Sequence, residues 1–400
     1  MQFVASTEDW RSLRTFRLAG HPNVSVATYQ APYSEARLRA TINGYRGAPL
    51  HAVLETFFNI RDYSDAMLTD KRLFRQVQAF DADLFVADPG NLGGWALADA
   101  LKLQKAMVQV PGFTPPLSCL VLINSHFALA PPRALGPKVH VVGPLTAKPP
   151  SPLPAYLEAF MQSAGRSGVV YASLGYTAIP EKHELQAVAD ALAAVAPVSV
   201  LWKLTAADQQ LLGVGNATLG SNIHLIEWAP QNDVLGHPAT RAFLTQAGTN
   251  SFNEAAYHGV PIVGLPLFAE QPDNMARAVE QGFGLSVDVN DAMGLSHNLR
   301  RALQQVLGDP SFPGNATRVS RLIKSTRWSP AVQAASLIEH AAWTKGDAYL
   351  DKPMKSMHWH QQLLLDVIAV LAMITAGLAV LAVLVIKYCS MHVQRHAKLL

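Results

Sequence analysis

The sequence has 400 residues, 50% of them hydrophobic and 15% charged, a balance that suits two ordinary domains and excludes a disordered chain. With only Cys119 and Cys389 there is neither a disulfide framework nor a thiolate zinc site. The formal net charge of +3 comes from Lys387, Arg395 and Lys398 at the end of the chain, so the rest is neutral overall, which argues against nucleic-acid binding.

Short apolar segments alternate with helical patterns over residues 1–147. The first residues, MQFVAS, predict a strand that runs into a helix, and they lack the charged and apolar regions of a signal peptide. Apolar runs at residues 84–87 and 106–110 predict further strands, with a helix expected between them at residues 94–103. The alternation indicates parallel βα units, so we predict a first α/β domain at residues 1–147.

A proline-rich segment, KPPSPLP, breaks both periodicities, as a stiff connector would. We predict a linker at residues 148–156 and a second, doubly wound α/β domain at residues 157–345. The alternation there predicts strands at residues 168–174, 198–203, 223–227, 242–245 and 261–265, and helices at residues 184–194 and 253–257. Ligands of open α/β sheets bind at the carboxyl ends of the strands, so we expect a site in a cleft between the two domains.

The C-terminal part predicts a membrane anchor. Residues 367–386 form an uncharged apolar run, and about 20 helical residues span roughly 30 Å of hydrocarbon. A buried core helix is the alternative, but such helices rarely run this long without a polar face. We expect a juxtamembrane segment at residues 346–362, a transmembrane helix at residues 363–386 and a basic cytosolic tail at residues 387–400.

Several cofactor and metal motifs are missing. The chain has no G-x-G-x-x-G opening a helix, no G-x-x-x-x-G-K-[ST] and no H-E-x-x-H. Asp81 and Asp83 could form a metal-binding pair, but aspartates that shape turns are common before a strand. We therefore expect neither a cofactor nor a metal.

The segment from Trp228 to Gln271 reads WAPQNDVLGHPATRAFLTQAGTNSFNEAAYHGVPIVGLPLFAEQ. It closely resembles the donor-binding signature of the UDP-glycosyltransferases, the family of the animal UDP-glucuronosyltransferases and of plant natural-product glycosyltransferases. Similar short segments are VVYASLG at residues 169–175, DLFVAD at residues 83–88, NSHFAL at residues 124–129 and Asp366 before the anchor. The resemblance implies an α/β fold of GT-B type, with two Rossmann-like domains facing a cleft, an incomplete acceptor-side domain at residues 1–147 and a UDP-sugar donor domain at residues 157–345.

The residues of this segment also suit a nucleotide on physical grounds. Trp228 would stack on a uracil ring and Gln231 would bond its amide-like edge, although core packing is the alternative for Trp228. Gly248, Asn250 and Ser251 follow a strand and open a helix, where free amides attract a diphosphate.

Two acidic residues complete the predicted donor site. Glu254 follows Ser251 by three residues, the spacing of a capping box, which is its structural alternative. The resemblance assigns the matching glutamate to the ribose hydroxyls, and Glu270 with Gln271 to the sugar hydroxyls. A carboxylate can accept hydrogen bonds from two adjacent hydroxyls, which suits a hexose.

Two positions depart from the family pattern. Gln246 stands where the family usually has His, so a neutral donor replaces a charged one facing the diphosphate, at a cost of about 1 kcal/mol or somewhat more. Tyr176 stands where a small hydroxyl residue is common, and its bulk would crowd the pyrophosphate.

The resemblance also implies a base that removes the proton of the acceptor hydroxyl, a His near the N-terminus oriented by an Asp. Asp88 matches that orienting Asp. The segment that carries the His is expected to precede Met1, which starts at the second strand of the domain. His21 lies nearest by position, but its context differs and is typical of a solvated loop. The chain therefore resembles an N-terminally truncated copy.

From these features we predict a membrane-bound UDP-glycosyltransferase that moves a hexose or glucuronic acid from a UDP-sugar to a hydroxyl of a small lipophilic acceptor, with inversion. The alternative is a catalytically inactive relative that binds UDP-sugar, and a third hypothesis is a tethered scaffold that binds no nucleotide. Further predicted partners are other copies of this chain or related transferases, in a homo- or hetero-oligomer. The sequons at Asn23, Asn216 and Asn315 are used only in the lumen, where we expect the globular part of this single-pass protein of the endoplasmic reticulum.

Overall fold

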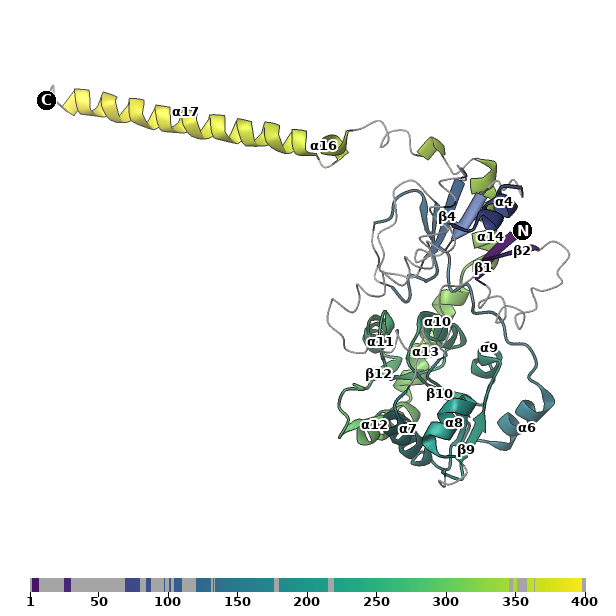
Figure 1. Ribbon diagram of the computed structural model, residues 1–400. Helices are drawn as coiled ribbons and strands as arrows, with labels where there is room; N and C mark the ends of the chain where they lie inside the picture. Colours follow the sequence, from purple (N-terminus) through teal and green to yellow (C-terminus); the bar gives the residue numbers. More distant parts are fainter. Residues whose placement is uncertain are drawn as a thin grey trace. The chain divides into compact units, whose positions relative to one another are not determined.

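The computed structural model describes residues 2–6, 25–29, 69–79, 84–87, 97, 101, 104–109, 120–130, 132, 134–175, 180–214, 219–344, 348–350, 358–362 and 364–397. The chain forms two compact units, Met1–Gly346 and Asp347–Leu400. The larger unit carries the parallel sheets, and the smaller one carries the long C-terminal helix (Figure 1).

The main sheet of the larger unit has six parallel strands in the order β12-β11-β10-β7-β8-β9. In chain order they are β7 (Val169–Ser173), β8 (Ser199–Lys203), β9 (Ile223–Ile226), β10 (Thr240–Thr245), β11 (Ile262–Gly264) and β12 (Gly284–Ser286). All five strands predicted after the linker are present. Every residue of β7 and β11 is buried, as expected for strands covered on both faces.

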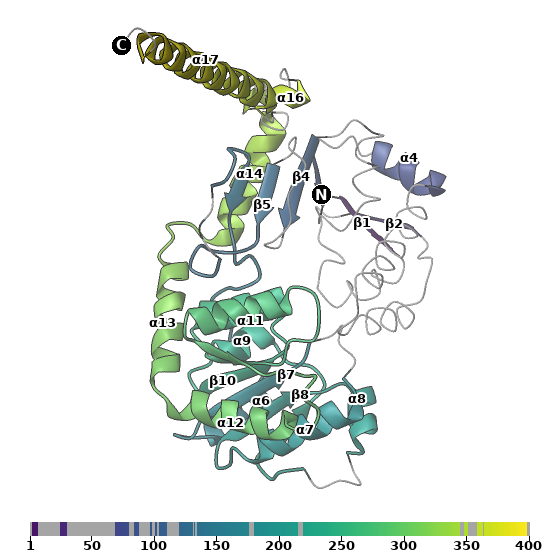
Figure 2. The ribbon, with the colours of Figure 1, turned by 90° about the vertical axis from the view of Figure 1, so that its left-hand side faces the viewer.

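Helices cover both faces of this sheet. They are α6 (Ala155–Ser163), α7 (Lys182–Ala193), α8 (Ala206–Leu212), α9 (Gln231–Leu235), α10 (Thr249–His258), α11 (Gln271–Glu280), α12 (Leu295–Gly308) and α13 (Ser311–Lys324). One core lies between the sheet and α7 and α12, and the other between the sheet and α6, α10, α11 and α13. Figure 2 shows α7 and α12 on one side of the strands and α9 and α11 on the other.

The first half of the chain contains two smaller parallel sheets. One pairs β1 (Gln2–Ser6) with β2 (Ser25–Tyr29), and the other has the order β3-β4-β5-β6, formed by Leu84–Ala87, Gln104–Gln109, Leu120–Ile123 and Val139–Val141. The strands expected at residues 84–87 and 106–110 are confirmed. The helix expected at residues 94–103 lies largely outside the described residues, although Leu97 is helical and buried.

Two helices accompany the four-stranded sheet. Helix α4 (Lys71–Ala79) follows Asp70, whose Oδ1 accepts from the amides of Arg72 (2.9 Å) and Leu73 (3.0 Å), an N-cap geometry. Helix α14 (Pro330–Trp343) comes after the six-stranded sheet in the chain but contacts β4 and shares a core with the first half. Its buried Ala334 and Ala341 pack with Leu120, Leu122 and Val142.

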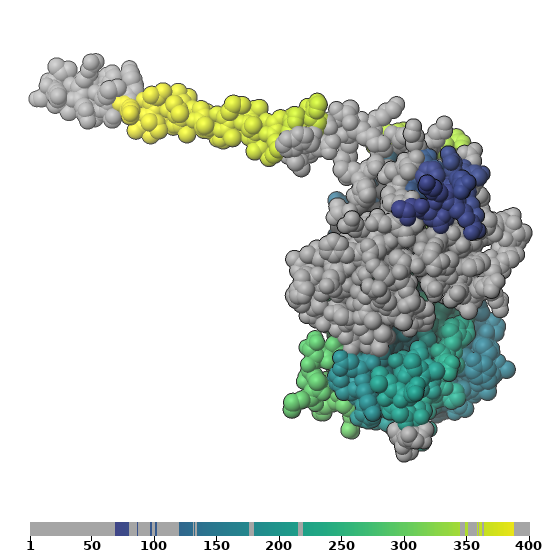
Figure 3. Space-filling model, viewed as in Figure 1, coloured from purple at the N-terminus to yellow at the C-terminus, as the bar shows by residue number. Residues whose placement is uncertain are grey.

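The smaller unit contains a short 3-10 turn, η2 (Ala348–Leu350), and helices α16 (Trp359–Gln362) and α17 (Leu365–Ala397). The part of α17 from Leu365 to Lys387 is long and apolar enough to cross a membrane, and none of it is buried inside the protein. Figure 3 shows its side chains, in yellow, at the surface. Within its own unit this helix is not packed as a buried core helix, the alternative that composition allowed.

Candidate functional site

The candidate site lies where β10 ends and α10 begins. After Thr245 the chain turns through Gln246 and Ala247 to Gly248, the N-cap of α10. Ala247 has a φ of 63°, an unusual conformation for a residue with a side chain. The turn is held by Asn274 on α11, whose Nδ2 donates to the Ala247 carbonyl at 2.9 Å. Backbone strain fixed in this way is typical of functional turns.

Gln231, on the first turn of α9, joins two predicted donor-site residues on α10. Its Nε2 donates to Ser251 Oγ at 3.0 Å and to Glu254 Oε2 at 2.8 Å. Burial raises the pKa of Glu254, the hydrogen bond from Gln231 opposes this shift, and the charge of Asp233 adds to it. The capping-box alternative for Ser251 and Glu254 is wrong, because α10 begins at Thr249 and both residues lie inside the helix.

The predicted sugar ligands lie at the start of α11. Glu270 Oε1 accepts from the amide of Thr249 at 3.1 Å and from its hydroxyl at 2.9 Å, so this carboxylate reaches the N-terminus of α10. Gln271 is buried, and its Oε1 accepts from the amides of Leu267 (2.7 Å) and Phe268 (3.2 Å). Gln271 therefore shapes the loop that carries Glu270.

The remaining predicted donor residues differ in exposure. The Trp228 side chain is 65% exposed, so the core-packing alternative is wrong and its ring is open for stacking. Gln246 is buried, and its Oε1 has no hydrogen-bond partner among the described residues. Asn250 is exposed, and its Oδ1 accepts from Thr146 Oγ1 at 3.5 Å. Asp88 and Tyr176 lie outside the described residues.

A glycine makes room for Gln246. Gly175, just after β7, has a φ of 82°, and a Cβ placed there would lie 2.1 Å from Gln246 Nε2. The adjacent carboxyl ends of β7 and β10 thus bring the segment VVYASLG and the segment after β10 together, as the sequence predicts.

Sequence reasoning missed two residues of this site. Thr249 bonds Glu270, and Asn274 holds the Ala247 turn and approaches Thr249 Oγ1 at 3.4 Å. A signal for Asn274 was available, since it follows Gln271 by three residues and therefore shares its face of α11. Among the described residues no group of three or more His, Cys, Asp or Glu side chains could hold a metal ion.

Solved structures share this architecture. The chain is similar to Os79 from O. sativa, solved in complex with U2F and trichothecene, with a TM-score of 0.64 and 16% identity over 86% of this chain and 92% of that one. It is similar also to CalG4, the calicheamicin glycosyltransferase, with a TM-score of 0.63 and 18% identity over 85% of this chain and 90% of that one. The fold is therefore the GT-B fold of glycosyltransferases, as predicted.

The family follows from the sequence comparisons. The model of the family "UDP-glucoronosyl and UDP-glucosyl transferase" matches residues 58–399. UDP-glucuronosyltransferase 2C1 of Oryctolagus cuniculus is 41% identical over 65% of this chain and 50% of its own length. UDP-glucuronosyltransferase 2B1 of Rattus norvegicus is 38% identical over 82% of this chain and 60% of its own. The chain belongs to this UDP-glycosyltransferase family, and it spans about half the length of the curated relatives that it matches.

Proposed function

We propose that the protein transfers a hexose or glucuronic acid from a UDP-sugar to a hydroxyl of a small lipophilic acceptor. The observation that carries the proposal is the contact of Gln231 with Ser251 and Glu254 beside the exposed ring of Trp228. It places a flat aromatic surface, an amide and a carboxylate next to the N-terminus of a helix. The aromatic ring and the amide suit a base, the carboxylate suits the ribose hydroxyls, and the helix N-terminus suits a diphosphate.

The proposed roles follow the chemistry of the groups. Trp228 stacks on uracil, Gln231 bonds the base, and Glu254 accepts from the ribose hydroxyls. Gln246, Gly248, Asn250 and Ser251 surround the diphosphate at the start of α10. Glu270 and Gln271 hold the sugar hydroxyls, Gln271 through Nε2 because its Oε1 is engaged with the loop amides.

The proposed transfer inverts the anomeric carbon and uses no metal. The acceptor oxygen attacks that carbon as its bond to the UDP oxygen breaks, and a base oriented by Asp88 takes the hydroxyl proton. The leaving diphosphate gains charge in this step, and the α10 amides with Gln246 stabilise it. The neutral side chain of Gln246 makes this stabilisation weaker than a charged one would.

The test uses the full chain in detergent. We expect UDP to raise its melting temperature, and UDP-glucose or UDP-glucuronic acid to yield sugar conjugates with a panel of phenols and steroids, detected by mass spectrometry. Glu254→Ala should weaken UDP binding at least about tenfold, because the ribose hydroxyls and the half-buried amide of Gln231 lose their acceptor. Glu280→Ala is the matched control, since Glu280 is an exposed carboxylate on α11. Absence of UDP stabilisation would reject the proposal.

A second candidate is a relative that binds UDP-sugar without transferring it. The position of Gln246, buried with an unpartnered oxygen where the family usually has His, favours this candidate. Stabilisation by UDP without conjugate formation, for any donor and acceptor tested, would support it over the transferase.

We propose further that the protein is anchored in the endoplasmic reticulum membrane by α17, with its globular part in the lumen. The apolar helix and the sequons at Asn23 and Asn216 support this placement. A glycosidase-sensitive shift in gel mobility, together with resistance to protease in sealed vesicles, is expected. A protein that protease degrades outside intact vesicles would contradict it.

A further inference from the structure

The segment WAPQNDVLGHP carries polar residues that hydrogen-bond the linker. Directly after Gln231, Asn232 and Asp233 contact the linker. Asn232 Oδ1 accepts from the amide of Lys148 at 3.1 Å, and Asp233 Oδ1 accepts from the amide of Ser151 at 2.9 Å. Asn232 Nδ2 also donates to Asp233 Oδ1 at 3.0 Å, so the two side chains support each other.

A histidine and a glycine complete this contact. His258, at the end of α10, lies 3.0 Å through Nε2 from Asn232 Oδ1. Burial lowers the pKa of His258 to about 4, with Lys324 adding to the shift and Asp233 opposing it, so the ring is neutral at pH 7 and Nε2 donates. A Cβ on Gly236 would lie 2.6 Å from Pro150 and 2.8 Å from His258, so only glycine allows the linker this close.

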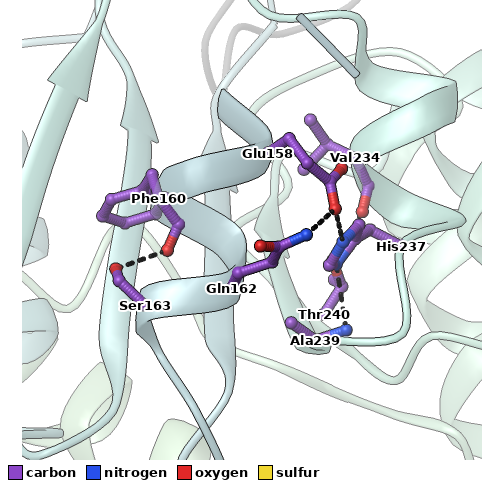
Figure 4. Close-up of polar contacts among 8 residues, drawn as sticks. All are labelled: Glu158, Phe160, Gln162, Ser163, Val234, His237, Ala239 and Thr240. Carbon is purple, nitrogen blue, oxygen red and sulfur yellow. Dashed lines mark hydrogen bonds and ion pairs between the residues drawn. The ribbon is translucent and has the colours of Figure 1, made fainter. Parts of the chain in front are cut away.

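The next turn of the chain holds the helix that follows the linker. Figure 4 shows His237 facing Glu158 and Gln162 on α6. His237 Nδ1 accepts from the amide of Ala239 at 3.1 Å, which leaves Nε2 to donate to Glu158 Oε1 at 3.4 Å. Gln162 Nε2 donates to the same oxygen at 2.7 Å. Residues 148–158 are therefore hydrogen-bonded at three points to residues 232–237.

Helix α9 thus has two polar connections. At its first residue, Gln231 bonds Ser251 and Glu254 in the donor site, and at its next two residues it bonds the linker backbone. A helix of five residues has a single turn and moves as one body, so a shift of Gln231 moves Asn232 and Asp233 with it.

We propose that Asn232 and Asp233 are positioning residues that fix the interdomain linker and transmit occupation of the donor site to it. The transmission rests on the proposed function, because it requires that UDP occupies the site at Gln231. The fixing of the linker does not depend on that function. UDP binding is expected to order α9 and, through the linker, to align the acceptor-side half with the donor-side half. Loss of the two side chains is expected to free the linker and leave the donor pocket intact.

Hydrogen exchange tests the first part directly. Four prolines interrupt residues 148–154, so the amides of Lys148, Ser151 and Leu153 are the ones this segment can exchange, and the first two donate to α9. In the full chain without UDP, Asn232→Ala and Asp233→Ala should speed exchange of the linker peptide about tenfold. Asp233→Asn should keep the protection, because its amide oxygen still accepts from Ser151.

Asp288→Asn is the matched control, since Asp288 accepts from the amide of Asn290 in its own exposed loop and does not contact the linker. In this variant the linker peptide should exchange at the wild-type rate. Unchanged linker exchange in Asp233→Ala and Asn232→Ala, at an unchanged melting temperature, would overturn the proposal whether or not the protein binds UDP.

UDP tests the second part. In the wild type, UDP should slow exchange of the linker peptide, and in Asp233→Ala it should still raise the melting temperature but no longer slow that exchange. If UDP stabilises the wild type but leaves linker exchange unchanged, the transmission is wrong while the donor site stands. If UDP gives no stabilisation at all, the proposed function fails instead.

Turnover gives a third readout that a purely structural role would not change. Asp233→Ala should lower kcat about tenfold and shift the KM for the UDP-sugar less than about threefold, because alignment of the two halves affects transfer more than donor binding. Ser151→Pro removes the same hydrogen bond from the linker side. It should lower kcat similarly, and the double variant should lose little more. Additive losses would contradict a shared contact.

Discussion

At the scale of single residues, Gln246 has the least favourable surroundings among the described residues of the proposed donor site. Its side chain is buried, and its Oε1 has no partner in the part of the chain that the structure describes; a buried oxygen without a hydrogen bond costs about 1–3 kcal/mol. Gly175 leaves the space that the amide occupies. We therefore expect a bound ligand to give the Gln246 side chain hydrogen bonds that it lacks without one.

Gln246→His should strengthen UDP binding about fivefold at pH 6, because a protonated imidazole adds about 1 kcal/mol through a charge-assisted bond to the diphosphate. The gain should shrink at pH 8, where the imidazole is neutral. Isothermal titration at the two pH values measures it. Gln246→Leu is the control for removing the unpartnered oxygen alone. Equal affinities of Gln246→His and wild type at pH 6 would contradict the assigned role.

At the scale of elements, a hydrogen bond between two helical segments decides whether one glycosylation sequon can be modified. Asn315 lies in the second turn of α13, and its Nδ2 donates to the carbonyl of Gly282, just after α11, at 3.1 Å. Gly282 has a φ of 73°, so this bond satisfies a carbonyl at the turn that ends α11. The side-chain amide of Asn315, to which a glycan would be attached, is therefore already used in a hydrogen bond within the fold.

Asn315→Ala should leave the glycosidase-sensitive gel mobility unchanged, because a glycan on Asn315 is incompatible with this bond. It should lower the melting temperature by about 2–4 °C, the effect of losing about 1 kcal/mol in a domain of this size. Gel mobility before and after glycosidase treatment and a thermal melt test both parts. A mobility shift on substitution would show that Asn315 carries a glycan.

The contact of His258 on α10 with Asn232 on α9 makes the stability of the folded protein depend on pH. The pKa of His258 is lowered from 6.5 to about 4 by burial first and by Lys324 second. As pH falls through 6.5, the unfolded chain therefore takes up this proton before the folded one does, and stability is lost down to the folded pKa. Tyr257, Asp233 and Lys324 are the other groups facing this ring.

The melting temperature should fall as pH drops from about 6.5 to about 4, and His258→Gln should reduce that slope. Thermal melts of both proteins across this range, in one ionic strength, measure the difference. Parallel curves for the two proteins would exclude His258 as a source of the pH dependence.

The sequence predicts the elements of the second domain well for a physical reason. Strands buried on both faces, such as β7 and β11, are continuous apolar runs, and the alternation of strand and helix leaves few topologies. The motif also gathers most residues of the proposed donor site, because they are close in the chain. It does not show that Ser251 and Glu254 lie inside α10, or that Gln271 shapes its own loop, since these depend on where a helix begins and on side-chain geometry.

Long-range packing is the part that the sequence leaves undecided. Nothing in the apolar pattern of residues 330–343 says which sheet they cover, and the structure places them on β4 and β5 rather than on the six-stranded sheet. The contacts of Asn232 and Asp233 with the linker were missed for a similar reason, because they join residues more than 80 positions apart.

At the scale of the whole molecule, removal of α17 and removal of α14 should affect the protein differently. A chain ending at residue 346 keeps the larger unit whole, so it should be extracted from membranes by carbonate and still be stabilised by UDP. A chain ending at residue 328 also loses α14 and uncovers Leu120 and Leu122. Its melting temperature should be lower by several degrees, because a core interface is lost. Equal stability of the two truncated chains would mean that α14 contributes nothing to the first sheet.

The placement of α14 also has a consequence during protein synthesis. Leu120 is made about 200 residues before Ala334 and Ala341, which cover it. At roughly 5–20 residues per second, the ribosome needs about 10–45 s to produce the covering helix. Throughout that interval the apolar side of β5 is exposed on the nascent chain. The first half of the protein can therefore complete this core only after α14, in the second half, has been translated.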